Sequence, residues 1–142
     1  MNASEKLNAV FLRPLHLVHL ASTYMNIGQP QVALDLLDQA TGIMLASEER
    51  FFAAELHRLK GEAVLQIGGD GEAELERART IAHGQAAQLW ELRAAVSLAR
   101  LWRDQRHRAE ARELLAPIYG WFTEGFGTAH LKEAKALLEE LS

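Results

Sequence analysis

Apolar residues recur along most of the chain at the spacing of one helix face. Leu17, Leu20, Ala21, Tyr24 and Met25 occupy positions i, i+3, i+4, i+7 and i+8, which places them on the same side of a helix. No run of residues combines period-two alternation with β-branched and aromatic side chains, so no strand is predicted. The pattern therefore predicts an all-α fold.

Glycine and proline divide this helical pattern into segments, at residues 28–30, 68–71, 84 and 120–127. Glycine after one helix and proline at the start of the next follow the usual asymmetry of helix ends. We predict helices over residues 12–27, 30–45, 48–67, 71–83, 87–106, 108–119 and 128–141. No element is assigned to residues 1–10, an N-terminal segment that could be disordered, and residues 11–142 form one helical repeat domain.

Similar residues recur at similar offsets, which indicates internal repeats. Ala21 and Ala99 are each followed three residues later by an aromatic residue, and Gly61 is the matching small residue of a less regular middle copy. These anchors are separated by 40 and 38 residues. The positions expected to pack the repeats together are Leu17, Leu20, Ala21, Tyr24, Ala33, Leu37, Ala40, Gly61, Leu75, Ala78, Leu98, Ala99, Trp102, Ala111 and Leu115.

The small anchors have a physical role, because two helices approach closely only where small side chains face each other. Gly28 and Gly68 each lie seven residues after an anchor, and Arg106 holds this position in the third copy. In the middle copy Leu75 and Ala78 match Leu37 and Ala40 but come two residues early. The connection in the middle copy is therefore expected to be shortened.

These residues resemble a known repeat family. The pattern Leu17-x2-Leu20-Ala21-x2-Tyr24, followed by Gly28 and Ala33-x3-Leu37-x2-Ala40, is similar to the tetratricopeptide repeat, and Ala95-x2-Leu98-Ala99-x2-Trp102 with Ala111-x3-Leu115 is similar to a further copy. The resemblance implies a right-handed superhelical stack of antiparallel helix pairs. About three repeats would cover residues 14–120, and "AHLKEAKALLEEL" would be a C-terminal capping helix.

A second resemblance covers most of the chain and is strongest from about residue 54 to 141. The stretches "AAELHRLKGE", "ELRAAVSLARLWRDQ" and "AEARELLAPIYGWFTEGF" with "LKEAKALLEEL" resemble the C-terminal repeat arm of large bacterial multidomain regulators. In that family an adenylate cyclase-like or winged-helix domain comes first, and a P-loop ATPase module precedes the repeats. The resemblance implies that this chain could be such a regulatory arm, separated from the upstream domains.

Composition narrows the function classes. The chain has 142 residues, 49% of them hydrophobic and 24% charged, which is a globular balance. Its formal net charge of −4 disfavours nucleic-acid binding. Since it has no cysteine, no secretory signal pattern and no apolar run of membrane-spanning length, we expect a cytoplasmic protein without membrane association.

The sequence contains no legible catalytic set. GxxxxGK(S/T), which would hold a triphosphate, is absent, and so is the GxSxG elbow of a nucleophilic serine. His16 and His19 are three residues apart, but Glu5 and Asp35 are the nearest carboxylates in sequence, too few for a zinc site. We expect no catalytic residue, metal or cofactor, and therefore no enzyme.

The tetratricopeptide resemblance also implies where a ligand would bind, because the first helices of the pairs line a concave groove. The charged groove candidates are Glu55, Arg58, Glu62, Arg93, Arg100 and Arg103. Arginine can hold a carboxylate or phosphate in a fork. Alternatively, Glu55, Arg58 and Glu62 only pair with each other along an exposed helix. Ser22 stands where the carboxylate clamp of chaperone-binding arrays has asparagine.

The function that these features favour is protein–protein interaction, with a partner protein or peptide held in the groove. The alternative is regulation of a signalling enzyme, an adenylate cyclase-like protein or an ATPase, by its C-terminal arm. The apolar stretch "FLRPLHLVHL" at the N-terminal end of the array could in addition support a homodimer.

Overall fold

A computed structural model describes residues 3–47 and 52–142, with side chains at 14–46 and 52–142. The described residues form seven helices and no strand, which confirms the all-α prediction. The helices are α1 (Ala3–Asn26), α2 (Pro30–Ser47), α3 (Ala53–Gln66), α4 (Glu72–Gly84), α5 (Gln88–Asp104), α6 (Arg108–Tyr119) and α7 (Ala129–Leu141). The predicted third helix began at residue 48, and residues 48–51 lie outside the described ones.

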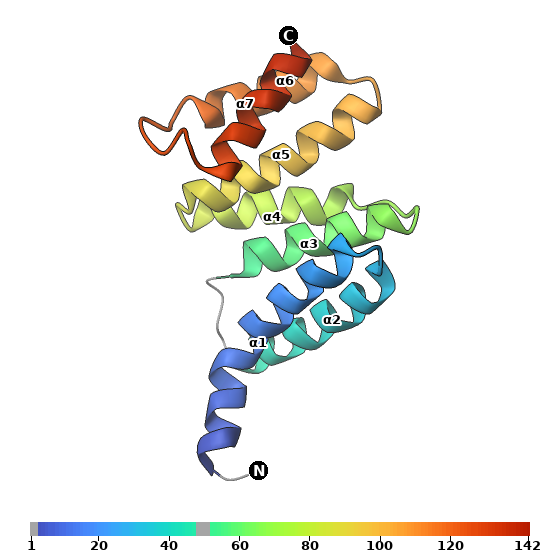
Figure 1. Cartoon of the computed structure of the whole chain (residues 1–142), viewed down its shortest axis with the longest axis vertical. Helices are drawn as coiled ribbons and strands as arrows, with labels where there is room; N and C mark the ends of the chain where they lie inside the picture. The colour runs from blue at the N-terminus through green and yellow to red at the C-terminus, as the bar shows by residue number, and fades with distance from the viewer. Residues whose placement is uncertain (1–2, 48–51) are drawn as a thin grey trace.

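The helices stack along the long axis of the molecule, with the two termini at opposite ends (Figure 1). Each helix packs against the next one in sequence, and α1 also contacts α3, α3 contacts α5, and α5 contacts α7. In the described part of the chain, no such contact joins α2 to α4 or α4 to α6. The odd-numbered helices therefore form one continuous face of the stack.

The first helix is longer than the pattern predicted. It begins at Ala3 and so includes most of the segment for which no element was assigned. Pro14 lies inside this helix and is fully buried. Farther along the flank expected to support a homodimer, Leu17 and Val18 are buried and Leu15 is exposed. Phe11, Leu12 and Arg13 have no described side chain, and the homodimer stays a prediction.

The same turn ends the first helix of all three predicted repeats. Gly28, Gly68 and Arg106 have positive φ angles of 79°, 84° and 67°. In each turn the N–H of this residue donates to the carbonyl three residues back, and the next N–H donates to the carbonyl five residues before it, at 2.7–3.1 Å. This is the left-handed helix end of the Schellman motif.

Small residues bring the helices of each pair together. Ala21, Ala33, Ala99 and Ala111 are fully buried between their helices. In the middle pair the backbones are closest, because a Cβ on Gly71 would lie 2.2 Å from the carbonyl oxygen of Gly61. Gly71 thus corresponds to Ala33 of the first pair. It follows the left-handed Gly68 by three positions, whereas Ala33 follows the left-handed Gly28 by five. The connection is shortened as the register of Leu75 and Ala78 predicted.

The core consists of two clusters of buried apolar side chains. One joins α1, α2 and α3, and the other joins α5, α6 and α7. Of the predicted packing positions, Leu20, Tyr24 and Trp102 are only half-buried, and the rest are buried. The indole N–H of Trp102 donates to Glu72 at 2.5 Å and so ties α5 to α4. These contacts hold the odd-numbered helices side by side, and the candidate site lies between them.

Candidate functional site

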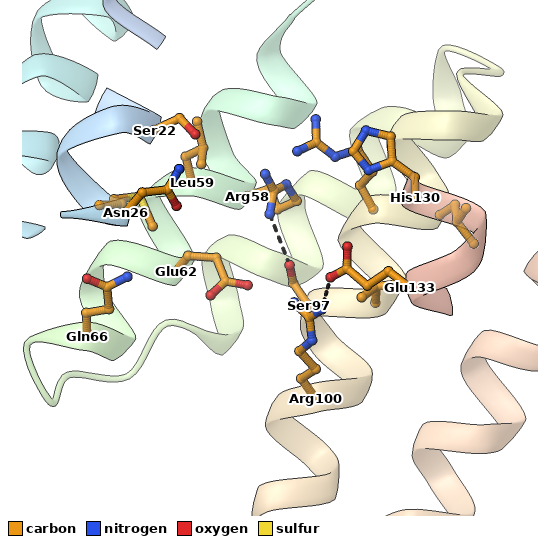
Figure 2. A pocket seen from close by; sticks show the side chains of 14 residues that line it. Ser22, Asn26, Arg58, Leu59, Glu62, Gln66, Ser97, Arg100, His130 and Glu133 are labelled. Carbon is orange, nitrogen blue, oxygen red and sulfur yellow. Dashed lines mark hydrogen bonds and ion pairs between the residues drawn. The ribbon is translucent and has the colours of Figure 1, made fainter. Parts of the chain in front are cut away.

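A pocket of about 320 Å³ lies on the face of the odd-numbered helices. Four helices contribute to it, α1, α3, α5 and α7, and polar and charged groups line most of its wall (Figure 2). Its lining residues are Ser22, Met25, Asn26, Arg58, Leu59, Glu62, Gln66, Leu92, Arg93, Val96, Ser97, Arg100, His130 and Glu133. A cavity of this size falls in the range of ligand sites.

Two arginines share one carboxylate at the edge of the pocket. Glu55 Oε1 lies 2.7 Å from both Arg58 Nη2 and Arg93 Nη1, which come from different helices. Arg58 Nε also donates to Glu55 Oε2 at 3.0 Å, which makes that pair bidentate. The cluster of Glu55, Arg58 and Arg93 therefore carries one net positive charge.

The pKa values of this cluster reflect its burial and its charges. Burial alone would raise the pKa of Glu55, but the hydrogen bonds and charge of Arg58, with the charge of Arg93, bring it below its ordinary value. Burial alone would lower the pKa of Arg58, and the hydrogen bonds and charge of Glu55 raise it above the ordinary value. Burial and the neighbouring Arg58 lower the pKa of Arg93. Glu55 is thus firmly ionised and holds both guanidinium groups.

The other charged groups of the pocket come from three helices. Arg100 on α5 pairs with Glu133 on α7, and Arg58 Nη1 donates to the buried Ser97 hydroxyl at 3.4 Å. The side chain of Glu62 on α3 makes no hydrogen bond with any described residue and acts on Arg58 and Arg100 through its charge alone.

Of the six charged residues predicted for the groove, four line the pocket: Arg58, Glu62, Arg93 and Arg100. Glu55 lies beside it and holds Arg58 and Arg93. Arg103 lies elsewhere, paired with Asp104 at 3.1 Å and Glu140 at 3.0 Å. Glu55 and Arg58 pair along the helix as the alternative interpretation required, whereas Glu62 does not join them.

Sequence reasoning missed His130 and Glu133, which α7 contributes to the pocket. The repeat pattern gave no register for this helix, since it belongs to no predicted pair. Their spacing of three residues, which puts two polar side chains on one helix face, was the one available signal. Burial and the charge of Arg93 lower the pKa of His130 below its ordinary value.

Two further findings concern other classes of site. Within the described ranges, no group of three or more histidine, aspartate or glutamate residues could hold a metal ion. None of the helices in the part of the chain that the structure describes has the length and apolar character needed to cross a membrane. His16 and His19 are both exposed on α1.

Comparison of this chain with protein-family models, with curated protein sequences and with solved structures found no match.

Proposed function

We propose that the chain is a non-enzymatic, tetratricopeptide-like module that binds a partner protein in the groove of its odd-numbered helices. The single observation that carries this proposal is the charged pocket that α1, α3, α5 and α7 build together. Three antiparallel helix pairs with small residues buried between their helices support the relation to the repeat family. In this proposal the pairs form a right-handed superhelix, α7 caps it, and the module works in the cytoplasm.

The contacts among helices favour this arrangement over a globular bundle. Odd-numbered helices touch each other while the described even-numbered helices α2, α4 and α6 do not. Helices that are closer on one side than on the other give a stack whose closer side is concave, which is how repeat proteins create extended binding surfaces. The pocket lies on that closer side.

The pocket also keeps charged groups available to a partner. Arg93 is 27% exposed and Arg100 is 41% exposed at their side chains, so both can still reach a ligand. Each has N–H groups beyond the one that binds Glu55 or Glu133, and a guanidinium offers five such donors. Exposed ion pairs exchange easily for pairs with a partner, because each contributes little by itself.

Site-specific photocrosslinking tests the proposal. A photoreactive side chain at Ser22, inside the pocket, should crosslink a protein that the same group at Arg77, exposed on α4, does not. The captured protein is then purified and titrated against the wild-type chain and against Arg100→Gln, which should weaken binding about fivefold to tenfold by removing one charged contact.

Two results would contradict the proposal. One is a purified partner whose affinity is unchanged by substitutions in the pocket. The other is hydrolase or cyclase activity of the purified chain itself, which would place the pocket in an enzyme. Circular dichroism of Arg100→Gln serves as the control that the fold is intact.

A further inference from the structure

The pocket carries charges of opposite sign at its two ends. His130 lies at one end, and Glu62 lies across the pocket from it (Figure 2). Arg93 lines the same pocket and supplies the positive charge near His130, since the pKa of the imidazole is lowered first by burial and then by this charge. The charges that shift the pKa values of Arg93 and His130 include Glu55 and Arg58 but not Glu62. The imidazole of His130 and the carboxylate of Glu62 therefore lie on opposite sides of the pocket (Figure 2), and the charge of Glu62 acts on Arg58 and Arg100.

Free hydrogen-bonding capacity remains at these two ends, and also on Arg100, which among the described residues pairs with Glu133 through Nη2 only. Arg58 spends its donors on Glu55 and Ser97, and Arg100 is paired with Glu133. Arg93 binds Glu55 through Nη1 only, so within the described residues its Nε and Nη2 groups have no partner. The carboxylate of Glu62 likewise accepts no hydrogen bond from the described part of the chain.

Neutral polar side chains extend the pocket beyond its charges. Ser22 and Asn26 on α1 and Gln66 on α3 line it, and none of their side chains hydrogen-bonds to a described residue. Each can both donate and accept, as the amide groups of a peptide backbone require. A free carboxylate or amine would leave this polar wall unused, whereas an extended peptide would not.

We propose that the pocket binds a partner segment that carries an acidic and a basic side chain close together, the carboxylate on Arg93 and His130 and the cation on Glu62. This inference rests on the proposed function and names its ligand chemistry. A purely acidic segment would meet Glu62 and Glu133, and a purely basic one would meet three arginines, so each is repelled by part of the wall. Only the mixed pair satisfies both ends.

The experiment uses short glycine–serine peptides, acetylated and amidated, with one aspartate and one lysine at varied spacing. Their binding to the full chain is followed by fluorescence polarisation, beside peptides with Asp→Asn or Lys→Gln. The best mixed peptide should bind about tenfold more tightly than either single-charge peptide, a difference typical of one well-placed charge contact.

Variants assign each peptide charge to its end of the pocket. Glu62→Gln should abolish the preference for lysine and keep that for aspartate, and Arg93→Gln should do the reverse. Glu62→Lys should prefer a second acidic residue in place of lysine. Glu76→Gln and Arg79→Gln are matched controls, because this pair (3.0 Å) lies on α4 outside the pocket, and both preferences should persist.

Two outcomes would overturn the inference. If affinity depends on the aspartate alone and Glu62→Gln does not change the affinity for any peptide, the pocket recognises only an anion. The groove would then remain a binding site, but the mixed-charge ligand would be wrong. If no peptide binds, the mixed-charge ligand is wrong, and the crosslinking experiment decides separately whether a protein docks in the groove. Free lysine and free aspartate serve as additional probes, and tighter binding of these than of the peptides would also contradict a peptide ligand.

Discussion

At the scale of single residues, Arg106 is the clearest departure from local preference. Its φ of 67° is in the left-handed region. This conformation is unfavourable for a residue that has a Cβ, but not for glycine. We expect Arg106→Gly to stabilise the protein by about 0.5–1 kcal/mol. Glycine relieves the backbone strain, and this gain is partly offset because glycine also raises the conformational entropy of the unfolded chain. Urea denaturation with a fitted midpoint and slope measures the change.

Arg112→Gly is the matched control for this substitution. Arg112 is exposed inside α6, where glycine costs roughly 1 kcal/mol because it is a poor helix former. The two variants should therefore shift the denaturation midpoint in opposite directions. Equal destabilisation by both would mean that Arg106 is not strained in solution.

Glu55 should make stability depend on pH. Burial alone would raise its pKa, but the hydrogen bonds and charge of Arg58, with the charge of Arg93, bring it below the ordinary value. A carboxyl group of this kind contributes stability that is fully present above the unfolded-state pKa and is lost as pH falls through the folded-state pKa. We expect stability to decline below about pH 4.3, and this decline to be smaller in Glu55→Gln.

At neutral pH, Glu55→Gln should cost about 2 kcal/mol, less than the loss of one partner from a fully buried pair, because the side chains of Glu55 and Arg58 remain 12% and 13% exposed. Glu139→Gln is the control, since Glu139 is exposed and lies 4.0 Å from Lys135. It should change stability by less than about 0.5 kcal/mol at pH 7. Equal stability losses in the two variants would contradict the role of Glu55.

For single residues, the sequence predicts the helix face on which a side chain lies better than it predicts the group with which that side chain pairs. Arg58, Glu62, Arg93 and Arg100 reach the pocket because the repeat register fixes the face on which they lie. The register cannot show that Arg103 turns to Glu140 at the end of α7, since this depends on where a helix outside the repeats packs. For the same reason His130 and Glu133 were missed.

At the scale of elements, the close approach of α3 and α4 depends on two glycines. A Cβ on Gly61 would lie 2.8 Å from Leu75 Cδ2 and 3.0 Å from the Gly71 carbonyl oxygen. Gly61→Ala should therefore destabilise the protein by about 1–2 kcal/mol, as overpacking outweighs the gain in helix propensity. Thermal unfolding followed by circular dichroism measures this loss.

Gly42 provides the opposite case in α2, because a Cβ there would have no neighbour within 4 Å. Gly42→Ala should stabilise the protein by about 0.5–1 kcal/mol through helix propensity alone. A stabilising effect of alanine at both positions would show that α3 and α4 are not in close contact at Gly61.

Helix boundaries were predicted well, because glycine and proline mark most ends. The shift of register in the middle pair was also visible, from Leu75 and Ala78. What the sequence could not show is that Gly71 itself faces Gly61, because a glycine in a turn and a glycine at a helix contact look alike. The extension of α1 to Ala3 was hidden since residues 1–10 have no clear apolar face.

At the scale of the whole molecule, the pocket exists because helices from both core clusters meet at its wall. Ser22 belongs to α1 in the first cluster, and His130 belongs to α7 at the far end of the sequence. A pairwise repeat pattern predicts neighbours one or two helices apart. It does not predict that α7 would complete a site to which α1 also contributes.

This arrangement makes the proposed binding depend on pH through His130. Burial and the charge of Arg93 on α5 lower its pKa, and it also faces Glu55 and Arg58 on α3, with Glu133 beside it on α7. A ligand carboxylate bound here would stabilise the protonated imidazole and raise that pKa. Binding would then take up a proton, so affinity should rise as pH falls through the pKa of the bound state and level off below that of the free state.

Titration of the mixed-charge peptide from pH 8 downwards measures this effect, which is limited to about tenfold per pH unit for one proton. His130→Gln should flatten the rise, and comparison with this variant removes the titration of the peptide's own aspartate. The peptide with Asp→Asn should show no rise with either protein, because nothing then favours the protonated histidine. An equal rise in wild type and His130→Gln would place the carboxylate away from α7 and leave Arg93 alone to bind it.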